Sequence, residues 1–180
     1  MPKSDILDII TPDQALIVLK QLAVQDPKIK KKAREIPLGL VGDVDVEGVT
    51  EEVFWALDSI AVEDVWDRSG SKRDGYVDPG DAAWEVFEEA LDPFLDSLRK
   101  CHKLGLTLQA KRHCMGILKG ICRFEKESKS EFKSWAVDAP GEYFVSTYQE
   151  WRKGNADKQD IAEMKRFVKA FCPTKANFCK

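Results

Sequence analysis

The stretch that decides the fold runs from Asp74 to Glu125 and reads DGYVDPGDAAWEVFEEALDPFLDSLRKCHKLGLTLQAKRHCMGILKGICRFE. It predicts a helix, a short turn and a second helix that packs back on the first. In the first helix apolar residues recur every three or four positions, which places them on one helical face. These residues are Ala83, Trp84, Phe87, Ala90, Leu91, Phe94, Leu95 and Leu98.

Local signals place the start of the first helix near Asp81. Asp78 or Asp81 can cap its open N–H groups, and Pro79 suits a first turn. Pro93 interrupts the apolar pattern without shifting it. Either the helix kinks there, or Asp92 caps a new helix that has Pro93 at its first position.

The second helix of the hairpin is expected from Thr107 to Glu125. Its apolar stripe comprises Leu106, Ala110, Cys114, Ile117, Leu118, Ile121 and Cys122. Gly116 and Gly120 lie four residues apart, and each costs up to ~1 kcal/mol relative to alanine in a helix interior. Close backbone approach, for example to the face of Trp84 and Phe87, would explain them; two tolerated glycines are the alternative. We expect the hairpin to bury Leu91, Phe94, Leu118 and Ile121.

The composition is that of a water-soluble globular protein. The chain has 180 residues, of which 43% are hydrophobic and 33% charged, enough for one domain with a sizeable core. No apolar run approaches the ~20 residues that span a bilayer, and the N-terminus lacks the features of a signal peptide. The net charge of -3 provides no general attraction to nucleic acid or anionic membranes. Five cysteines without a spacing framework favour reduced thiols and a cytoplasmic location.

Helical patterns continue on both sides of the hairpin and predict an all-α fold of about eight helices. The expected form is an irregular multi-helix bundle or a short helical-repeat solenoid within one domain, residues 1–180. Its predicted parts are an N-terminal helical pair at 1–36, a loop at 37–48, central helices at 49–125, C-terminal helices at 126–172 and a loose tail at 173–180.

Helix-start signals mark both helices of the N-terminal pair. Thr11 and Pro12 suit a helix start, and Asp26 followed by Pro27 repeats the signal. The segment ALIVLKQLAVQDPKIKKKAREI, residues 15–36, resembles one helical pair of the HEAT or armadillo type. The resemblance implies a helical-pair architecture over about one repeat. No period of the ~34–47 residues that define such repeats is evident along the chain.

Two further local expectations concern residues 44–54. Val44 and Val46 alternate with acids in a strand-like pattern that is very short. Thr50 is the expected cap of the next helix, with Val49 and Phe54 placed to form a hydrophobic staple across it.

The residues that could carry chemistry form no recognisable catalytic or metal motif. Cys101, His102, His113 and Cys114 could meet across the hairpin, but neither C-x-x-C nor H-E-x-x-H spacing occurs, and no glycine-rich elbow offers an oxyanion site. We therefore predict no catalytic residue, no metal and no cofactor. The loop from Arg68 to Gly75 could hold a phosphate through Arg68, Lys72 and Arg73, although a solvated loop is the simpler interpretation.

The most unusual charge feature lies between Asp43 and Asp67, where nine acids occur without a lysine or arginine. The acids are Asp43, Asp45, Glu47, Glu51, Glu52, Asp58, Glu63, Asp64 and Asp67. The basic run Lys28–Arg34 could neutralise them within the molecule. Alternatively, the acids form a contact face for a basic partner, with Trp55, Tyr76 or Trp151 as exposed anchors.

These observations favour a non-catalytic helical domain that binds a macromolecular partner. The expected partner is a protein, with a basic one suited to the acids; nucleic acid and membranes are not expected, and a small-molecule ligand is left open. One alternative is a regulatory or inhibitory module of a larger system, itself processed. The other is an enzyme of unrecognised type that uses the cysteines and histidines near the central hairpin.

Overall fold

The computed structural model describes residues 10–40, 43–73, 75–154 and 157–178, with the backbone alone for 34–40. Its residues group into two compact units, Met1–Asp43 and Val44–Lys180. Helices dominate both units, which confirms the predicted all-α class. A two-stranded antiparallel hairpin, β1 (Gly70–Lys72) and β2 (Gly75–Val77), makes the only sheet in the described ranges.

The first unit contains the predicted helical pair, α1 (Pro12–Gln25) and α2 (Pro27–Leu40). Thr11 caps α1 as expected, and its side chain and that of Gln14 form a reciprocal capping box with distances of 3.3 and 3.0 Å. Helix α2 continues past the predicted end at Ile36, so the predicted loop at 37–48 is shorter than expected.

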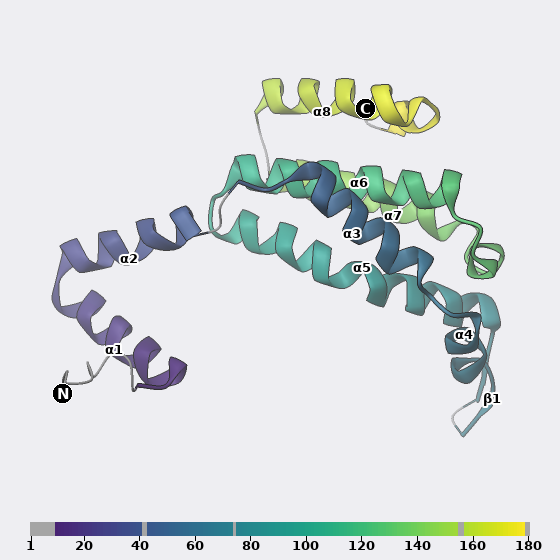
Figure 1. Cartoon of the computed structure of the whole chain (residues 1–180), viewed down its shortest axis with the longest axis horizontal. Coiled ribbons are helices and arrows are strands. Elements are labelled where there is room, and N and C mark those ends of the chain that lie inside the picture. The colour runs from purple at the N-terminus through teal and green to yellow at the C-terminus, as the bar shows by residue number, and fades with distance from the viewer. Residues whose placement is uncertain (1–9, 41–42, 74, 155–156, 179–180) are drawn as a thin grey trace, which may run out of the picture. The chain divides into compact units, whose positions relative to one another are not determined.

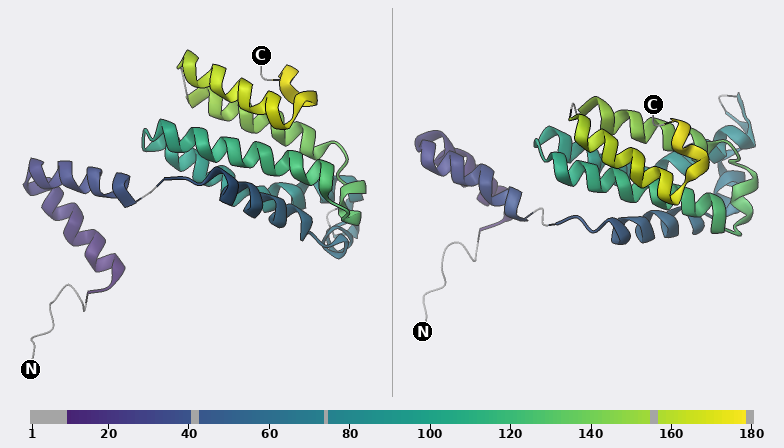
Figure 2. Two further views of the ribbon diagram at one scale, coloured as in Figure 1. Left: turned by 45° about the horizontal axis from the view of Figure 1, so that its top comes forward. Right: turned by 90° about the horizontal axis from the view of Figure 1, so that it is seen from above.

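The second unit is built around α6 (Thr107–Glu127), which packs against α3 (Val46–Asp58), α5 (Pro79–Lys103), α7 (Ala139–Gly154) and α8 (Lys158–Phe171) (Figures 1 and 2). The short helix α4 (Val62–Arg68) follows α3 and lies against α5. The predicted hairpin is present as α5 and α6, joined at Gly105, whose φ of +71° suits a glycine. Helix α5 is continuous through Pro93, so no new helix begins there.

The core of the hairpin largely matches the prediction. Leu91, Leu118 and Ile121 are fully buried, whereas Phe94 is only half-buried, contrary to expectation. Phe87 is also fully buried, and its ring lies among other aromatic rings of the core. Those rings and their centroid distances from Phe87 are Tyr143 at 5.4 Å, Phe124 at 6.0 Å and Phe132 at 6.5 Å.

Helix α3 begins five residues earlier than predicted. Its cap is Asp45, whose carboxylate accepts from the N–H of Glu47 at 3.1 Å, and Val46 starts the helix rather than a strand. Thr50 is therefore a buried residue inside α3, where its hydroxyl donates to the Val46 carbonyl at 2.7 Å. The predicted cap at Thr50, and with it the staple of Val49 and Phe54, is wrong because an aspartate caps at least as well and the longer helix buries more apolar surface.

The two glycines of α6 allow α3 to approach closely. A Cβ atom on Gly116 would lie 2.6 Å from Val49, and one on Gly120 would lie 2.6 Å from Val53. The prediction of close backbone approach is confirmed. The predicted partner, the face of Trp84 and Phe87, is wrong, because the glycines face α3.

The C-terminal residues are packed rather than loose. Pro173–Phe178 form a 3-10 helix, and Lys175 within it is only 6% exposed. The Lys175 ammonium pairs with Glu125 at 2.7 Å and lies 5.2 Å from the centroid of the Phe144 ring. A cation held by a carboxylate and an aromatic face anchors this segment, so the predicted loose tail is wrong for 173–178; residues 179–180 lie outside the described residues.

Helix α8 is attached to α6 by polar and covalent contacts. The Lys111 ammonium, which is nearly buried, donates to Asp160 and to Glu163 at 2.7 Å each. Cys122 and Cys172 form a disulfide, so the prediction that all thiols are reduced is wrong for this pair. Cys101 and Cys114 are buried thiols outside it.

We expect loss of the Cys122–Cys172 disulfide to lower the free energy of unfolding by about 2–4 kcal/mol. The disulfide joins two residues that are 50 positions apart in the sequence. Its removal increases the conformational entropy of the unfolded chain, which lowers stability. Denaturant unfolding with and without reductant measures the effect in wild type. The double variant Cys122→Ala and Cys172→Ala is the control, since reductant should then change nothing. Alkylation of both cysteines in unfolded, unreduced protein would contradict the cross-link.

Candidate functional site

The acidic run Asp43–Asp67 is distributed over the start of α3, α3 itself and α4. Two of its members are neutralised by α6. Glu47 accepts from the Lys119 ammonium at 2.5 and 2.7 Å, and Glu51 pairs with the Arg123 guanidinium. These carboxylates belong to the packing of α3 on α6, and the base partners are not those of the run Lys28–Arg34 that the sequence suggested.

Four other acids of the run remain exposed. Glu52, Glu63, Asp64 and Asp67 form no salt bridge with any residue that the structure describes. Glu63 and Asp64 lie in the first turn of α4, where the positive end of the helix dipole favours them. Asp45 is an exposed cap, and Asp43 is exposed and precedes it.

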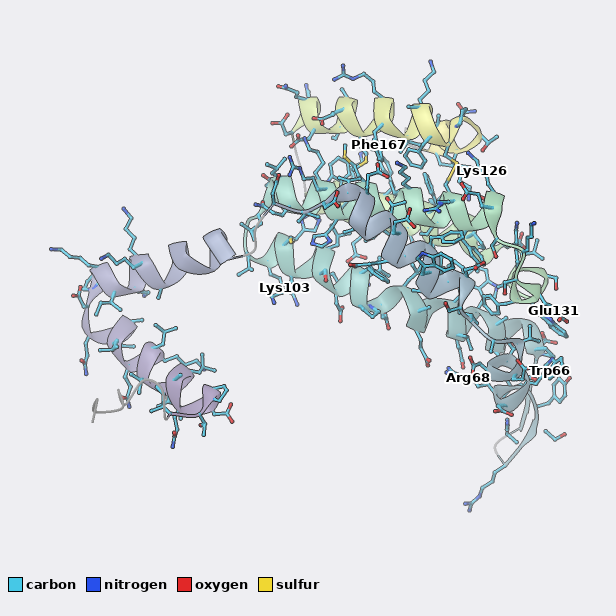
Figure 3. The ribbon with its side chains drawn as sticks, in the orientation of Figure 1. Trp66, Arg68, Lys103, Lys126, Glu131 and Phe167 are labelled. Atoms are coloured by element: carbon cyan, nitrogen blue, oxygen red, sulfur yellow. A yellow bond between two sulfur atoms is a disulfide. The ribbon has the colours of Figure 1, made fainter. Side chains whose placement is uncertain are left out.

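Three large aromatic side chains lie exposed on α3, α4 and β2. Trp55 of α3 is 57% exposed, Trp66 of α4 is 54% exposed and Tyr76 of β2 is 70% exposed. Figure 3 shows Trp66 near Arg68 at the end of the unit where α4 lies. Exposed tryptophan and tyrosine side chains in an aqueous environment are typical binding anchors.

The prediction of Trp151 as a third exposed anchor is wrong. Trp151 is fully buried on α7, and its ring centroid lies 5.9 Å from that of Tyr148. Trp66 is the exposed tryptophan that sequence reasoning did not select. Periodicity could not have found it, because Trp66 follows the buried Val62 by four residues and so shares its helical face; only the packing of α4 leaves it exposed.

We refer to the exposed residues of α3, α4 and β2 as the acidic–aromatic segment. Helical spacing places one acid beside each tryptophan, because Glu52 precedes Trp55 by three residues on α3 and Glu63 precedes Trp66 by three on α4. The segment is defined by Glu52, Trp55, Glu63, Asp64, Trp66, Asp67 and Tyr76.

The basic loop Arg68–Gly75 is engaged with protein groups. Arg68 donates to both carboxylate oxygens of Glu89 at 2.7 Å, and the Lys72 ammonium donates to the Asp67 carbonyl at 2.6 Å. The loop forms the β1–β2 hairpin, in which Ser71 faces Tyr76. Arg73 is exposed, and Asp74 lies outside the described residues. Arg68 and Lys72, two of the three basic residues proposed to bind a phosphate, are thus engaged in the β1–β2 hairpin and in the contact with Glu89 of α5.

The cysteines and histidines of the central hairpin are poorly placed for nucleophilic chemistry. Burial raises the pKa of the Cys101 thiol, which disfavours the reactive thiolate. Burial lowers the pKa of His113, and its Nδ1 atom has no hydrogen-bond partner in the described residues. His102 packs against the backbone of Gly154, where a Cβ atom would meet its ring. In the described ranges no three His, Cys, Asp or Glu residues are grouped as metal ligands.

A cleft of about 400 Å³ lies between α5 and α7. Its lining comprises Trp84, Glu88, Leu95, Arg99, Glu142, Tyr143, Ser146 and Glu150. Two of its charged side chains pair with each other, since Arg99 donates to Glu150 at 2.8 Å. Burial and a hydrogen bond to Glu88 raise the pKa of Tyr143, so its hydroxyl remains protonated and acts as a donor at neutral pH.

Comparisons of the chain with family models, curated proteins and solved structures find no match. None of the helices in the described ranges combines the length and the apolar character needed to cross a membrane.

Proposed function

We propose that the protein is a non-catalytic helical domain that binds a basic protein partner through the acidic–aromatic segment. The observation that carries the proposal is the exposure of Trp55, Trp66 and Tyr76 beside acids without salt bridges in the described residues. Such rings supply most of the binding free energy of typical interfaces, and the carboxylates steer a basic partner toward them.

The packing supports a division of the acidic run into two parts. Glu47 and Glu51 are compensated by α6 and contribute to the fold. The acids of α4 form no salt bridge in the described residues. The helix dipole favours Glu63 and Asp64, and Arg68 attracts Asp64, but these carboxylates stay exposed and a basic surface that covers them would add further attraction. The resemblance of residues 15–36 to one helical pair of the HEAT or armadillo type is a further reason for the proposal, because it implies a binding architecture.

Neutralising the α4 acids should weaken binding and reduce its dependence on salt. The test variant combines Glu63→Gln, Asp64→Asn and Asp67→Asn, and the control combines Glu47→Gln and Glu51→Gln. A pull-down from the native host, read by quantitative mass spectrometry, identifies the partner, which is then titrated at several salt concentrations. We expect the test variant to lose affinity and salt dependence and the control to keep both. If affinity and salt dependence are the same for the two variants, the proposal is wrong.

The aromatic contribution has a separate test. We expect Trp55→Ala with Trp66→Ala to reduce affinity for that partner at least tenfold, since exposed anchors commonly contribute more than ~1.4 kcal/mol. The thermal midpoint should change little, because both side chains are more than half exposed. Unchanged affinity in a folded double variant would exclude these rings from the interface.

A further inference from the structure

Helix α1 has the composition of a buried helix. Its 14 residues, PDQALIVLKQLAVQ, include only two charged side chains, Asp13 and Lys20. Apolar residues occur around its whole circumference, a pattern typical of a helix covered on every side. None of its residues is buried, however. Its large apolar side chains and their exposed fractions are Leu16 49%, Ile17 56%, Val18 42%, Leu19 43%, Leu22 41% and Val24 86%.

Helix α2 covers α1 only in part. Among its side chains at 27–33, the part that the structure describes, Ile29 and Ala33 are half-buried, while Lys28, Lys30 and Lys32 are exposed to solvent. Two helices of 14 residues each are marginal in water without further packing. The exposed apolar side chains of α1 therefore favour the packing of a further surface over this helix.

The most exposed face of α1 is self-complementary. Leu16, Ile17 and Val24 share this face with Asp13 and Lys20, because Asp13 and Lys20 lie seven residues apart, about two helical turns. Leu16 and Ile17 lie midway between the two charges. If two such helices cross antiparallel at this midpoint, Asp13 of each copy faces Lys20 of the other, and Leu16 of each faces Ile17 of the other.

We infer that α1 is the contact surface for a second copy of this chain. The two copies pack their α1 helices antiparallel about a two-fold axis near Leu16 and Ile17, and the basic α2 helices face solvent. Antiparallel two-helix pairs joined in this way form a four-helix bundle, a common solution for helices that cannot bury their faces alone. The apolar side chains on this face are Leu16, Ile17 and Val24, so the interface is small and we expect the association to be weak and reversible.

The charge on α2 argues against the basic partner proposed above as the occupant of this surface. A basic protein would approach α1 beside the lysines of α2 and be repelled. The self-association is thus independent of the acidic–aromatic segment, and either proposal can fail without the other.

Sedimentation velocity of the full chain, from about 1 μM to 1 mM, tests the inference in the range expected for a small interface. We expect a reversible monomer–dimer equilibrium. The double variant Leu16→Asp with Ile17→Asp should be monomeric throughout, with the same unfolding transition of residues 44–180. A monomeric wild type would overturn the inference and indicate that α1 is covered within its own molecule or by another protein. A dimer that persists in the double variant would also overturn it.

A charge exchange tests the antiparallel geometry. Asp13→Lys leaves two basic residues on the face and Lys20→Asp leaves two acidic ones, so each variant alone should dimerise at least tenfold more weakly. An equal mixture should recover the wild-type affinity as a heterodimer, because both charge pairs are then restored across the axis. Circular dichroism of each variant checks that α1 is intact. Intact variants that fail to recover on mixing would exclude this pairing of α1 with α1.

Discussion

Replacing Gly116 and Gly120 together by alanine is expected to lower the free energy of unfolding by about 2 kcal/mol. Each added methyl group would lie 2.6 Å from a valine of α3, a distance at which the two helices must move apart. Overpacking of this kind costs about 1–3 kcal/mol at each site. The higher helix propensity of alanine offsets up to ~1 kcal/mol of this cost at each site. The cost of overpacking is larger, so the expected net effect is destabilisation.

The matched control is Gly141→Ala in the first turn of α7. A Cβ atom at Gly141 would meet nothing within 4 Å, so the gain in propensity is not opposed by a clash. We expect this variant to be unchanged or slightly more stable. Denaturant unfolding of the three proteins gives the comparison. A stabilised Gly116→Ala and Gly120→Ala variant would mean that α3 does not lie against these glycines.

Leu118→Ala is expected to lower the free energy of unfolding by about 2–5 kcal/mol. Leu118 is fully buried in α6, which contacts α3, α5, α7 and α8, so the lost methyl groups leave a cavity that the surrounding helices cannot easily fill. The thermal midpoint should fall accordingly.

Leu108→Ala on the same helix is the control, because Leu108 is 46% exposed. The same chemical change at this site should have a much smaller effect, within about 1 kcal/mol. Equal losses at both positions would contradict the placement of Leu118 at the centre of the unit.

Local signals in the sequence were sufficient to locate several helix starts. Thr11 caps α1 as predicted, and Asp78, one of the two caps considered for α5, is the one that caps it, because a cap depends on hydrogen bonds to N–H groups only two or three residues away. The same rule could not choose between Asp45 and Thr50. The choice depends on α6, since the earlier start places Val46 and Val49 of α3 against Gly116.

The candidate site was predicted only in part for a similar reason. Apolar periodicity identifies which residues share a face, but it does not say which face meets the core when most of a helix is apolar or aromatic. Trp151 shares a helical face with Phe144, and Trp66 shares one with Val62, so only the packing of α7 and α4 decides that the first is buried and the second exposed.

The sequence by itself determined the all-α class, the α5–α6 hairpin, the close backbone approach at Gly116 and Gly120, and the acidity of residues 43–67. These features depend on periodicity, composition and neighbours a few residues apart. The tertiary structure alone decided that the glycines face α3, that Lys119 and Arg123 neutralise Glu47 and Glu51, and that Cys122 meets Cys172. Each of these contacts joins positions 50 or more residues apart, and it forms only because the other helices around α6 hold the two partners in place.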